Sequence, residues 1–131
     1  YKRILSRIIY YGYKFEQDAF VNGLYGELKS NNKKVFCFDD IKKTYCYKEY
    51  KKMLNALSFV NKHKGDYELL NELPKFYNGS IDKFIQQYKN ASEKFLRKIG
   101  RAIVKVRDEY MDEGIIFTMS PTLTRDKLYL L

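Results

Sequence analysis

The amino-acid sequence predicts a mainly α-helical protein, a bundle of about four helices in which the last helix is the longest. Three observations support this fold class. The chain has 131 residues, which suits one domain around one core. Apolar residues recur at intervals of three and four along several segments, as on one face of a helix. In the last segment this pattern continues over residues 81–113, enough for a rod of roughly 50 Å at the helical rise.

Two helical tracks are expected in the first 30 residues. The first has apolar residues at helical spacing and lysine and arginine between them (Ile4, Leu5, Ile8, Ile9). Gly12 should bend or end this helix, and a second apolar track then follows (Phe15, Ala19, Phe20, Leu24, Leu28). Because Gly23 and Gly26 each cost about 1 kcal/mol relative to alanine inside a helix, they suggest close helix packing or a local break.

The middle of the chain predicts a short strand at residues 33–38 and then a helix, with Asp39 and Asp40 as its cap. One stripe of this helix should face the core (Cys46, Tyr50, Met53, Leu54, Leu57, Val60). The opposite side should present a contact face to a partner (Tyr47, Lys48, Lys51, Lys52). The segment 62–65 should end the helix.

The long helix should begin after Ser80, a good N-cap, and stop at Gly114. Its core-facing seam steps by threes and fours (Ile81, Ile85, Tyr88, Ser92, Phe95, Ile99, Ala102, Val106). We expect residues 1–113 to form the helical domain and residues 114–131 to be a hairpin or extended tail of the same domain, because the tail is rich in β-branched residues.

A stripe of positive charge on the long helix is the strongest functional signal. Residues 83–107 contain Glu93 as their single acid, while basic residues recur along one face together with Gln87 (Lys83, Lys94, Arg97, Lys98, Arg101, Lys105). We call these six residues the basic stripe. Such a stripe can follow a phosphate backbone, and the net charge of +9 also favours polyanionic partners. The alternative is an ordinary solvated helix face.

Acidic residues crowd the other end of the same helix (Asp108, Glu109, Asp112, Glu113). Negative charge at a helix C-terminus opposes the helix dipole, so these side chains need partners. They could pair with Lys105 and Arg107, hold basic groups elsewhere in the fold, or contact a positively charged partner.

Catalysis and metal binding are not expected. Cys37, Cys46 and His63 are too few for a structural zinc site without carboxylates, and no phosphate-binding loop or nucleophile motif is present. Two buried free thiols are favoured, although a disulfide between Cys37 and Cys46 stays open. No segment is apolar enough to cross a bilayer, so we expect a soluble intracellular protein without a cofactor.

The Lys-, Tyr- and Ile-rich composition and the long basic helix RKIGRAIVKVRDEYMDE, residues 97–113, resemble the small helical-bundle virion proteins of crenarchaeal two-tailed viruses. That family includes a viral inhibitor of the host RNA polymerase. The resemblance implies a non-enzymatic four-helix bundle in the host cytoplasm or the virion.

Three functions follow as expectations. The resemblance implies inhibition of transcription by binding host RNA polymerase and obstructing its DNA-binding channel. The alternatives, which suit the positive charge better, are a DNA-coating structural virion protein and a sequence-tolerant nucleic-acid-binding regulator. Whether the direct partner is the polymerase or nucleic acid, and whether the chain forms a homo-oligomer, stay open.

Overall fold

The fold is mainly helical, as predicted. The computed structural model describes residues 1–30, 35–36, 38–112 and 116–117, and the side chains of residues 1–29 and 39–109. The helices are α1 (Lys2–Gly12), α2 (Lys14–Ser30), α3 (Phe38–Lys42), α4 (Tyr45–Lys62), α5 (Tyr67–Glu72) and α6 (Ile81–Asp112), and a 3₁₀ turn, η1, spans Leu73–Lys75.

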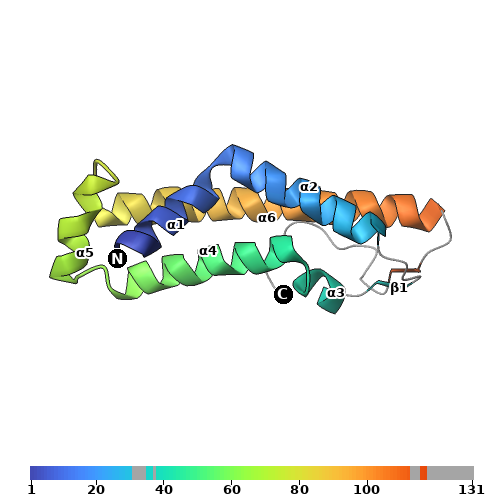
Figure 1. The fold of residues 1–131 in the computed structure, drawn as a ribbon, viewed down its shortest axis with the longest axis horizontal. Coiled ribbons are helices and arrows are strands. Elements are labelled where there is room, and N and C mark those ends of the chain that lie inside the picture. The colour runs from blue at the N-terminus through green and yellow to red at the C-terminus, as the bar shows by residue number, and fades with distance from the viewer. Residues whose placement is uncertain (31–34, 37, 113–115, 118–131) are drawn as a thin grey trace.

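The four long helices pack around one core as three rods (Figure 1). Helices α1 and α2 follow each other along one side and together form the first rod, and α4 and α6 are the other two. Each of α4 and α6 contacts both α1 and α2, and α4 also contacts α6. Since each rod touches the other two, the cross-section of the bundle is a triangle.

The first rod is broken where the sequence predicts it. Helix α1 ends at Gly12, and Tyr13 is extended, with φ −71° and ψ 131°. The carbonyl oxygen of Tyr13 then accepts from the backbone N–H of Gln17 at 3.0 Å as α2 begins. The expectation that Gly12 bends or ends the first helix is confirmed.

The expected apolar track of α2 is partly wrong. Leu24 and Leu28 are buried, but Phe15 is 85% exposed and Ala19 is also exposed. Restarting the helix after Tyr13 directs Gln17 and Leu24 towards the core, and residue 15 lies two positions, or about 200°, from residue 17. Phe15 therefore projects from the opposite face.

The glycines of α2 mark neither a close packing contact nor a break. Gly23 and Gly26 lie inside the continuous helix, and both are exposed. A Cβ atom at either position would have no described neighbour within 4 Å. The expectation of close packing or a local break at these two residues is therefore wrong.

Helix α4 is capped by Thr44 and not by the predicted Asp39 or Asp40. The Oγ1 atom of Thr44 accepts from the backbone N–H of Tyr47 at 3.3 Å and donates to the carbonyl oxygen of Ile41 at 2.6 Å. Asp39 and Asp40 lie instead in the first turn of α3, a separate short helix. The expected core stripe is confirmed, since its members are buried except for the half-buried Leu54.

Helix α6 begins as predicted, with the backbone N–H of Lys83 donating to Ser80 Oγ at 3.2 Å. Most of its expected seam is buried, and Ile81, Ile85 and Tyr88 pack against the core from its edge. The seam is wider than predicted, because Phe84, Leu96 and Ile103 are also buried. In a three-rod bundle α6 meets neighbours on two sides, so it needs two adjacent apolar stripes.

Two short strands pair at one end of the bundle, one after α2 and the other after α6 (Figure 1). Val35–Phe36 (β1) pairs in parallel with Ile116–Phe117 (β2), with Val35 opposite Ile116. Of the strand expected at 33–38, residues 33, 34 and 37 lie outside the described residues, and Phe38 begins α3. The expected hairpin or extended tail also lies outside them, apart from β2.

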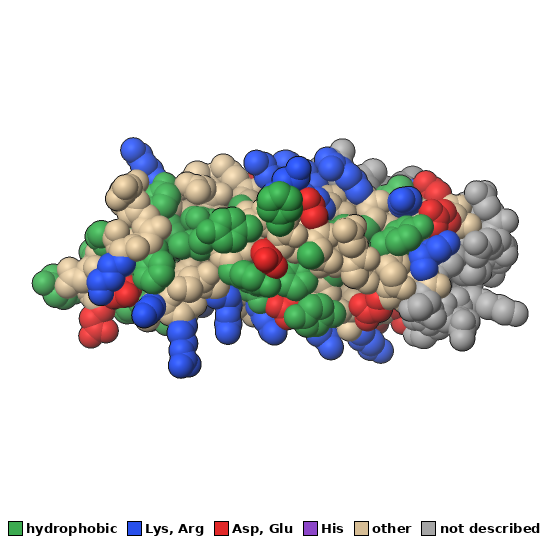
Figure 2. Space-filling view, turned by 45° about the horizontal axis from the view of Figure 1, so that its top comes forward, with side chains coloured by type: hydrophobic (Ala, Val, Ile, Leu, Met, Phe, Trp, Pro, Cys, Tyr) green, Lys and Arg blue, Asp and Glu red, His purple; other side chains and the backbone are tan. Residues whose placement is uncertain are grey.

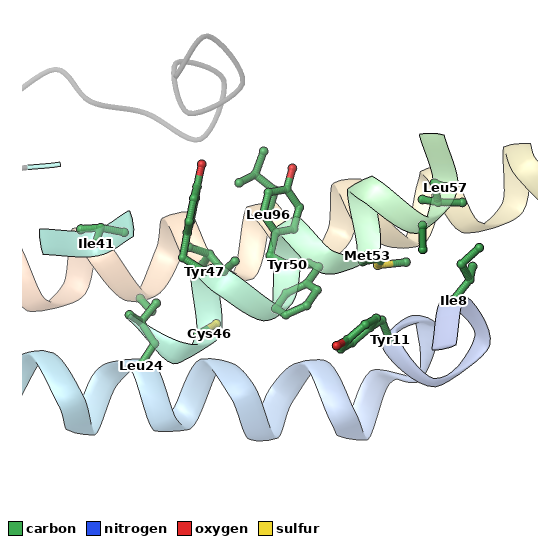
Figure 3. Close-up of a cluster of buried hydrophobic side chains, with 14 of the residues drawn as sticks. Ile8, Tyr11, Leu24, Ile41, Cys46, Tyr47, Tyr50, Met53, Leu57 and Leu96 are labelled. Carbon is green, nitrogen blue, oxygen red and sulfur yellow. The ribbon is translucent and has the colours of Figure 1, made fainter. Parts of the chain in front are cut away.

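The core contains side chains from all six described α-helices and from η1, and Figure 3 shows part of it. Its aromatic rings pack in two ways: Tyr50 lies edge-on to Phe95 with ring centroids 5.7 Å apart, and the half-buried Phe20 stacks on Phe95 at 6.1 Å. Such ring pairs add about 0.5–1.5 kcal/mol each beyond the area they bury.

Candidate nucleic-acid interface

A groove of about 840 Å³ lies between the α1–α2 junction and the first half of α6. Four lysines, three tyrosines and several amide side chains line it. We call it the Lys–Tyr groove, and its charged, aromatic and amide members are Lys14, Lys83, Lys94, Lys98, Tyr13, Tyr77, Tyr88, Gln17, Gln86, Gln87 and Asn90.

The groove is positively charged. No carboxylate is among its described lining residues, and Lys14, Lys83 and Lys94 are exposed. Lys98 is the least exposed of its lysines, and its Nζ lies 2.9 Å from Asp18 Oδ1. Lys98 is therefore compensated within the fold, and the other three ammonium groups are available to an anion.

The three tyrosines differ in how far their side chains are exposed. Tyr13 is 58% exposed, while Tyr77 and Tyr88 are half-buried. Burial raises the pKa of Tyr88, and the neighbouring phenols of Tyr13 and Tyr77 raise this pKa further. The hydroxyl group of Tyr88 therefore stays protonated and can donate a hydrogen bond in the groove.

The wall and floor of the groove are held by contacts between the first rod and α6. The ring of Tyr88 packs on Gly12 and on Phe84, whose ring centroid lies 4.7 Å away. The buried Gln17 donates from Nε2 to the carbonyl oxygens of Tyr11, at 2.8 Å, and Ala91, at 3.0 Å. Gln17 thereby ties the α1–α2 junction to α6.

The structure divides the predicted basic stripe. Lys83, Lys94 and Lys98 line the groove together with Gln87. Arg97, Arg101 and Lys105 are exposed on α6 but do not line it. The Nζ atom of Lys105 lies over the ring of Tyr25, 4.9 Å from its centroid.

The expected contact face on α4 requires one correction. Tyr47 is only 7% exposed, and its ring lies 5.8 Å from that of Tyr50. The reason is helical geometry: residue 47 precedes residue 50 by three positions, so both belong to one wide buried stripe. Lys48, Lys51 and Lys52 are exposed, as expected.

These lysines line a second depression, of about 320 Å³, together with Lys42, Tyr47 and Asn55. We call its lysines, Lys42, Lys48, Lys51 and Lys52, the α4 lysine surface. Lys52 Nζ donates to Glu49 Oε1 at 2.8 Å. Lys48 and Lys51 form no ion pair with a described residue.

Part of the acidic end of α6 is occupied by contacts within the fold. Glu109 accepts from Lys29 Nζ and from the hydroxyl group of Tyr25, both at 2.8 Å, and these two donors lower its pKa. Asp108 pairs with its neighbour Arg107 at 3.2 Å. The side chains of Asp112 and Glu113 lie outside the described residues.

Several groove residues do not follow from the sequence pattern, among them Tyr13, Lys14, Gln17 and Tyr77. Two of them flank the helix break after Gly12, and Tyr77 precedes the turn at Gly79, which has φ 155°. Gly12 and Gly79 are the one sequence signal that indicates these positions, because a break in a helix exposes the residues beside it.

The described residues were compared with the arrangements that metal binding and a Cys–His dyad require. They contain no group of three or more His, Cys, Asp or Glu side chains that could hold a metal ion. Cys46 lies in the first turn of α4 and His63 just after its last residue, so about 25 Å separates them and excludes a dyad. No described helix is both long and apolar enough to cross a membrane.

Comparisons with protein-family models, curated proteins and solved structures find no match to this chain. The resemblance to virion proteins therefore stays a prediction. Function is inferred from the chemistry of the Lys–Tyr groove.

Proposed function

We propose that this protein binds single-stranded nucleic acid, without a strong sequence preference, in the Lys–Tyr groove. The observation that carries the proposal is the composition of the groove: four lysines and three tyrosines with no carboxylate among the described lining residues. Lysines neutralise phosphates, and aromatic rings stack on unpaired bases. In this proposal the protein is a non-enzymatic binder that needs no cofactor.

The tyrosines favour a single strand over a duplex. In a duplex the base faces are already stacked on one another, so a side-chain ring gains nothing from them without opening the helix. An unpaired base can stack on Tyr13 or Tyr88, and each such contact is worth about 1–3 kcal/mol regardless of the base.

The lysines set the expected dependence on salt. Lys14, Lys83 and Lys94 have no described carboxylate partner, so about three phosphates should be neutralised. Each neutralised phosphate of a single strand contributes about −0.7 to the slope of log affinity against log salt, which gives a slope near −2.

Fluorescence anisotropy with a labelled oligothymidine tests the proposal. The triple variant Lys14→Glu, Lys83→Glu, Lys94→Glu should bind at least 10-fold more weakly than the wild type. The matched control is Lys2→Glu, Lys62→Glu, Lys89→Glu, which changes the net charge equally at exposed lysines outside both lysine-lined depressions.

Circular dichroism should show that both variants are folded. Equal weakening by the two triple variants would mean that charge alone, and not the groove, determines binding. Absence of wild-type binding at low salt would overturn the proposed function. A duplex of equal length serves as competitor and should bind less tightly than the single strand.

A DNA-coating role in a virion would use the same phosphate chemistry. Inhibition of host RNA polymerase is the second proposal, and it rests on the resemblance. The acidic end of α6 would be its natural contact, but Glu109 and Asp108 already pair within the fold. We therefore rank nucleic-acid binding first; unchanged transcription in vitro at saturating protein would exclude inhibition.

A further inference from the structure

The α4 lysine surface is separate from the groove. Its lysines come from α3 and α4, whereas the groove is formed by α1, α2, α6 and the loop that contains Tyr77. No residue lines both depressions. No described carboxylate lines the depression on α4 either, so it too is suited to an anion.

The two basic surfaces lie on opposite sides of the bundle. A groove between two rods of a triangular bundle faces away from the third rod, which here is α4. On α4 itself, Lys48 and Lys52 lie about 200° from the buried Cys46 and Tyr50, respectively, so they point outwards. On the face shown in Figure 2, Lys and Arg side chains gather along two opposite long edges, with hydrophobic and acidic side chains between them.

We propose that the α4 lysine surface is a second nucleic-acid site and that one copy of the protein bridges two strands. This inference rests on the proposed function of the groove. The occupant of the second site is the phosphate backbone of another nucleic-acid molecule. The exposed Lys48 and Lys51 would be its main contacts, because Lys52 already pairs with Glu49.

Physical distances make bridging feasible. A helix with its side chains is about 10–12 Å across, so two stacked layers separate the strands by roughly 20 Å. The Debye length at physiological ionic strength is about 8 Å, so repulsion between the two bound strands is largely screened. The second site offers no exposed ring, because Tyr47 is buried, so its binding should rest on phosphate neutralisation without base stacking.

A capture assay tests bridging. One oligothymidine is attached to beads, and a second, fluorescent oligothymidine, which cannot pair with the first, is captured only if the protein holds both. The wild type should capture it. With the variant Lys48→Glu, Lys51→Glu the captured fluorescence should be at least 10-fold lower than with the wild type. The affinity of this variant for a single strand, measured by anisotropy, should stay within about threefold of the wild-type value.

The matched control Lys62→Glu, Lys89→Glu carries the same charge change and should still bridge. If the Lys48→Glu, Lys51→Glu variant captures as much of the second strand as the wild type, the proposal of a second site is overturned. The same holds if the control variant loses as much capture as the Lys48→Glu, Lys51→Glu variant. Wild-type binding of one strand without capture of the second would overturn bridging alone. Absence of binding altogether would overturn the proposed function as well.

Size-exclusion chromatography with light scattering distinguishes bridging by one chain from bridging by a protein dimer. A monomeric wild type that bridges supports two sites on one chain. A dimeric wild type whose Lys48→Glu, Lys51→Glu variant becomes monomeric would show that these lysines serve dimerisation, which overturns the proposal.

Discussion

The ring of Tyr88 on α6 packs directly against the backbone of Gly12 at the end of α1. A Cβ atom on residue 12 would lie 2.6 Å from Cε1 and 2.8 Å from Cδ1 of this ring. Glycine at position 12 therefore determines where a tyrosine of the Lys–Tyr groove can sit. The break in the first rod and the shape of the groove have the same origin.

Gly12→Ala should destabilise the protein, because the Tyr88 ring must move. Overpacking costs about 1–3 kcal/mol, and the smaller entropy of the unfolded alanine chain offsets about 0.4–1 kcal/mol of it. We expect a net loss of about 1–2 kcal/mol in urea unfolding. In a Tyr88→Ala background the loss should vanish; an equal loss in both backgrounds would show that the ring contact is not the cause.

Gly23→Ala should have the opposite effect. This glycine is exposed inside α2, with no described atom within 4 Å of an added Cβ. Alanine is favoured over glycine in a helix by up to about 1 kcal/mol, so the free energy of unfolding should rise. A destabilised variant would reveal a contact at this position, contrary to the fold described above.

Phe15 and Phe95 should differ sharply in their contribution to stability. Phe15 is 85% exposed, whereas Phe95 is fully buried beside Tyr50. Phe15→Ala should change the free energy of unfolding by less than about 0.5 kcal/mol, and Phe95→Ala should cost about 3–5 kcal/mol. A large loss in the Phe15 variant would restore the original expectation that Phe15 belongs to the core.

Glu49 should make the protein sensitive to acid. Burial raises the pKa of this carboxyl group, but hydrogen bonds from Lys52 and Tyr11 outweigh burial and hold the pKa below its ordinary value. A lowered folded-state pKa means that ionised Glu49 stabilises the fold above the unfolded-state pKa. That contribution begins to be lost when the pH falls below about 4.3, the ordinary glutamate pKa. The loss continues as the pH falls through the lower pKa of the folded state.

The variant Glu49→Gln isolates this effect. Urea unfolding of wild type and variant is compared at neutral pH and at about pH 3, below the ordinary glutamate pKa. The wild type should lose more stability than the variant over this range. Parallel pH profiles would exclude Glu49 as a source of the acid sensitivity and leave other carboxylates, such as Glu109, to explain it.

Cys46 should be unreactive in the native protein. Burial raises the pKa of its thiol to about 12, with Glu27 and Glu49 adding to the effect, and the thiolate is the nucleophile. Iodoacetamide at mildly alkaline pH should leave Cys46 unmodified, as mapped by mass spectrometry, and should label it in urea. Labelling of Cys46 in the folded protein, without urea, would contradict its burial.

Helix periodicity predicted much of the fold correctly because it depends on local chemistry. Ser80 caps α6 and the stripe from Cys46 to Val60 is buried, since both follow from residues within a few positions of one another. The exposure of Phe15 could not be predicted in this way. It depends on the helical phase after the break at Gly12, which the packing of α2 against α4 and α6 determines.

The candidate interface was half predictable. Lys83, Lys94 and Lys98 followed from the charge pattern of one helix, but Tyr13 and Lys14 join them only because the α1–α2 junction packs on α6. Tyr47 was misplaced for a related reason: α4 meets neighbours on more than one side, so its buried stripe is wider than a single row.

By itself the sequence determined the helical class, the length of α6, the positive charge and the broken first rod, because periodicity, capping and net charge are local or additive properties. The tertiary structure alone decided which lysines share a groove with tyrosines, which carboxylates are already paired, and that the two basic surfaces face opposite ways. These features depend on contacts between residues distant in the chain. Such contacts are set by how three rods fill one core.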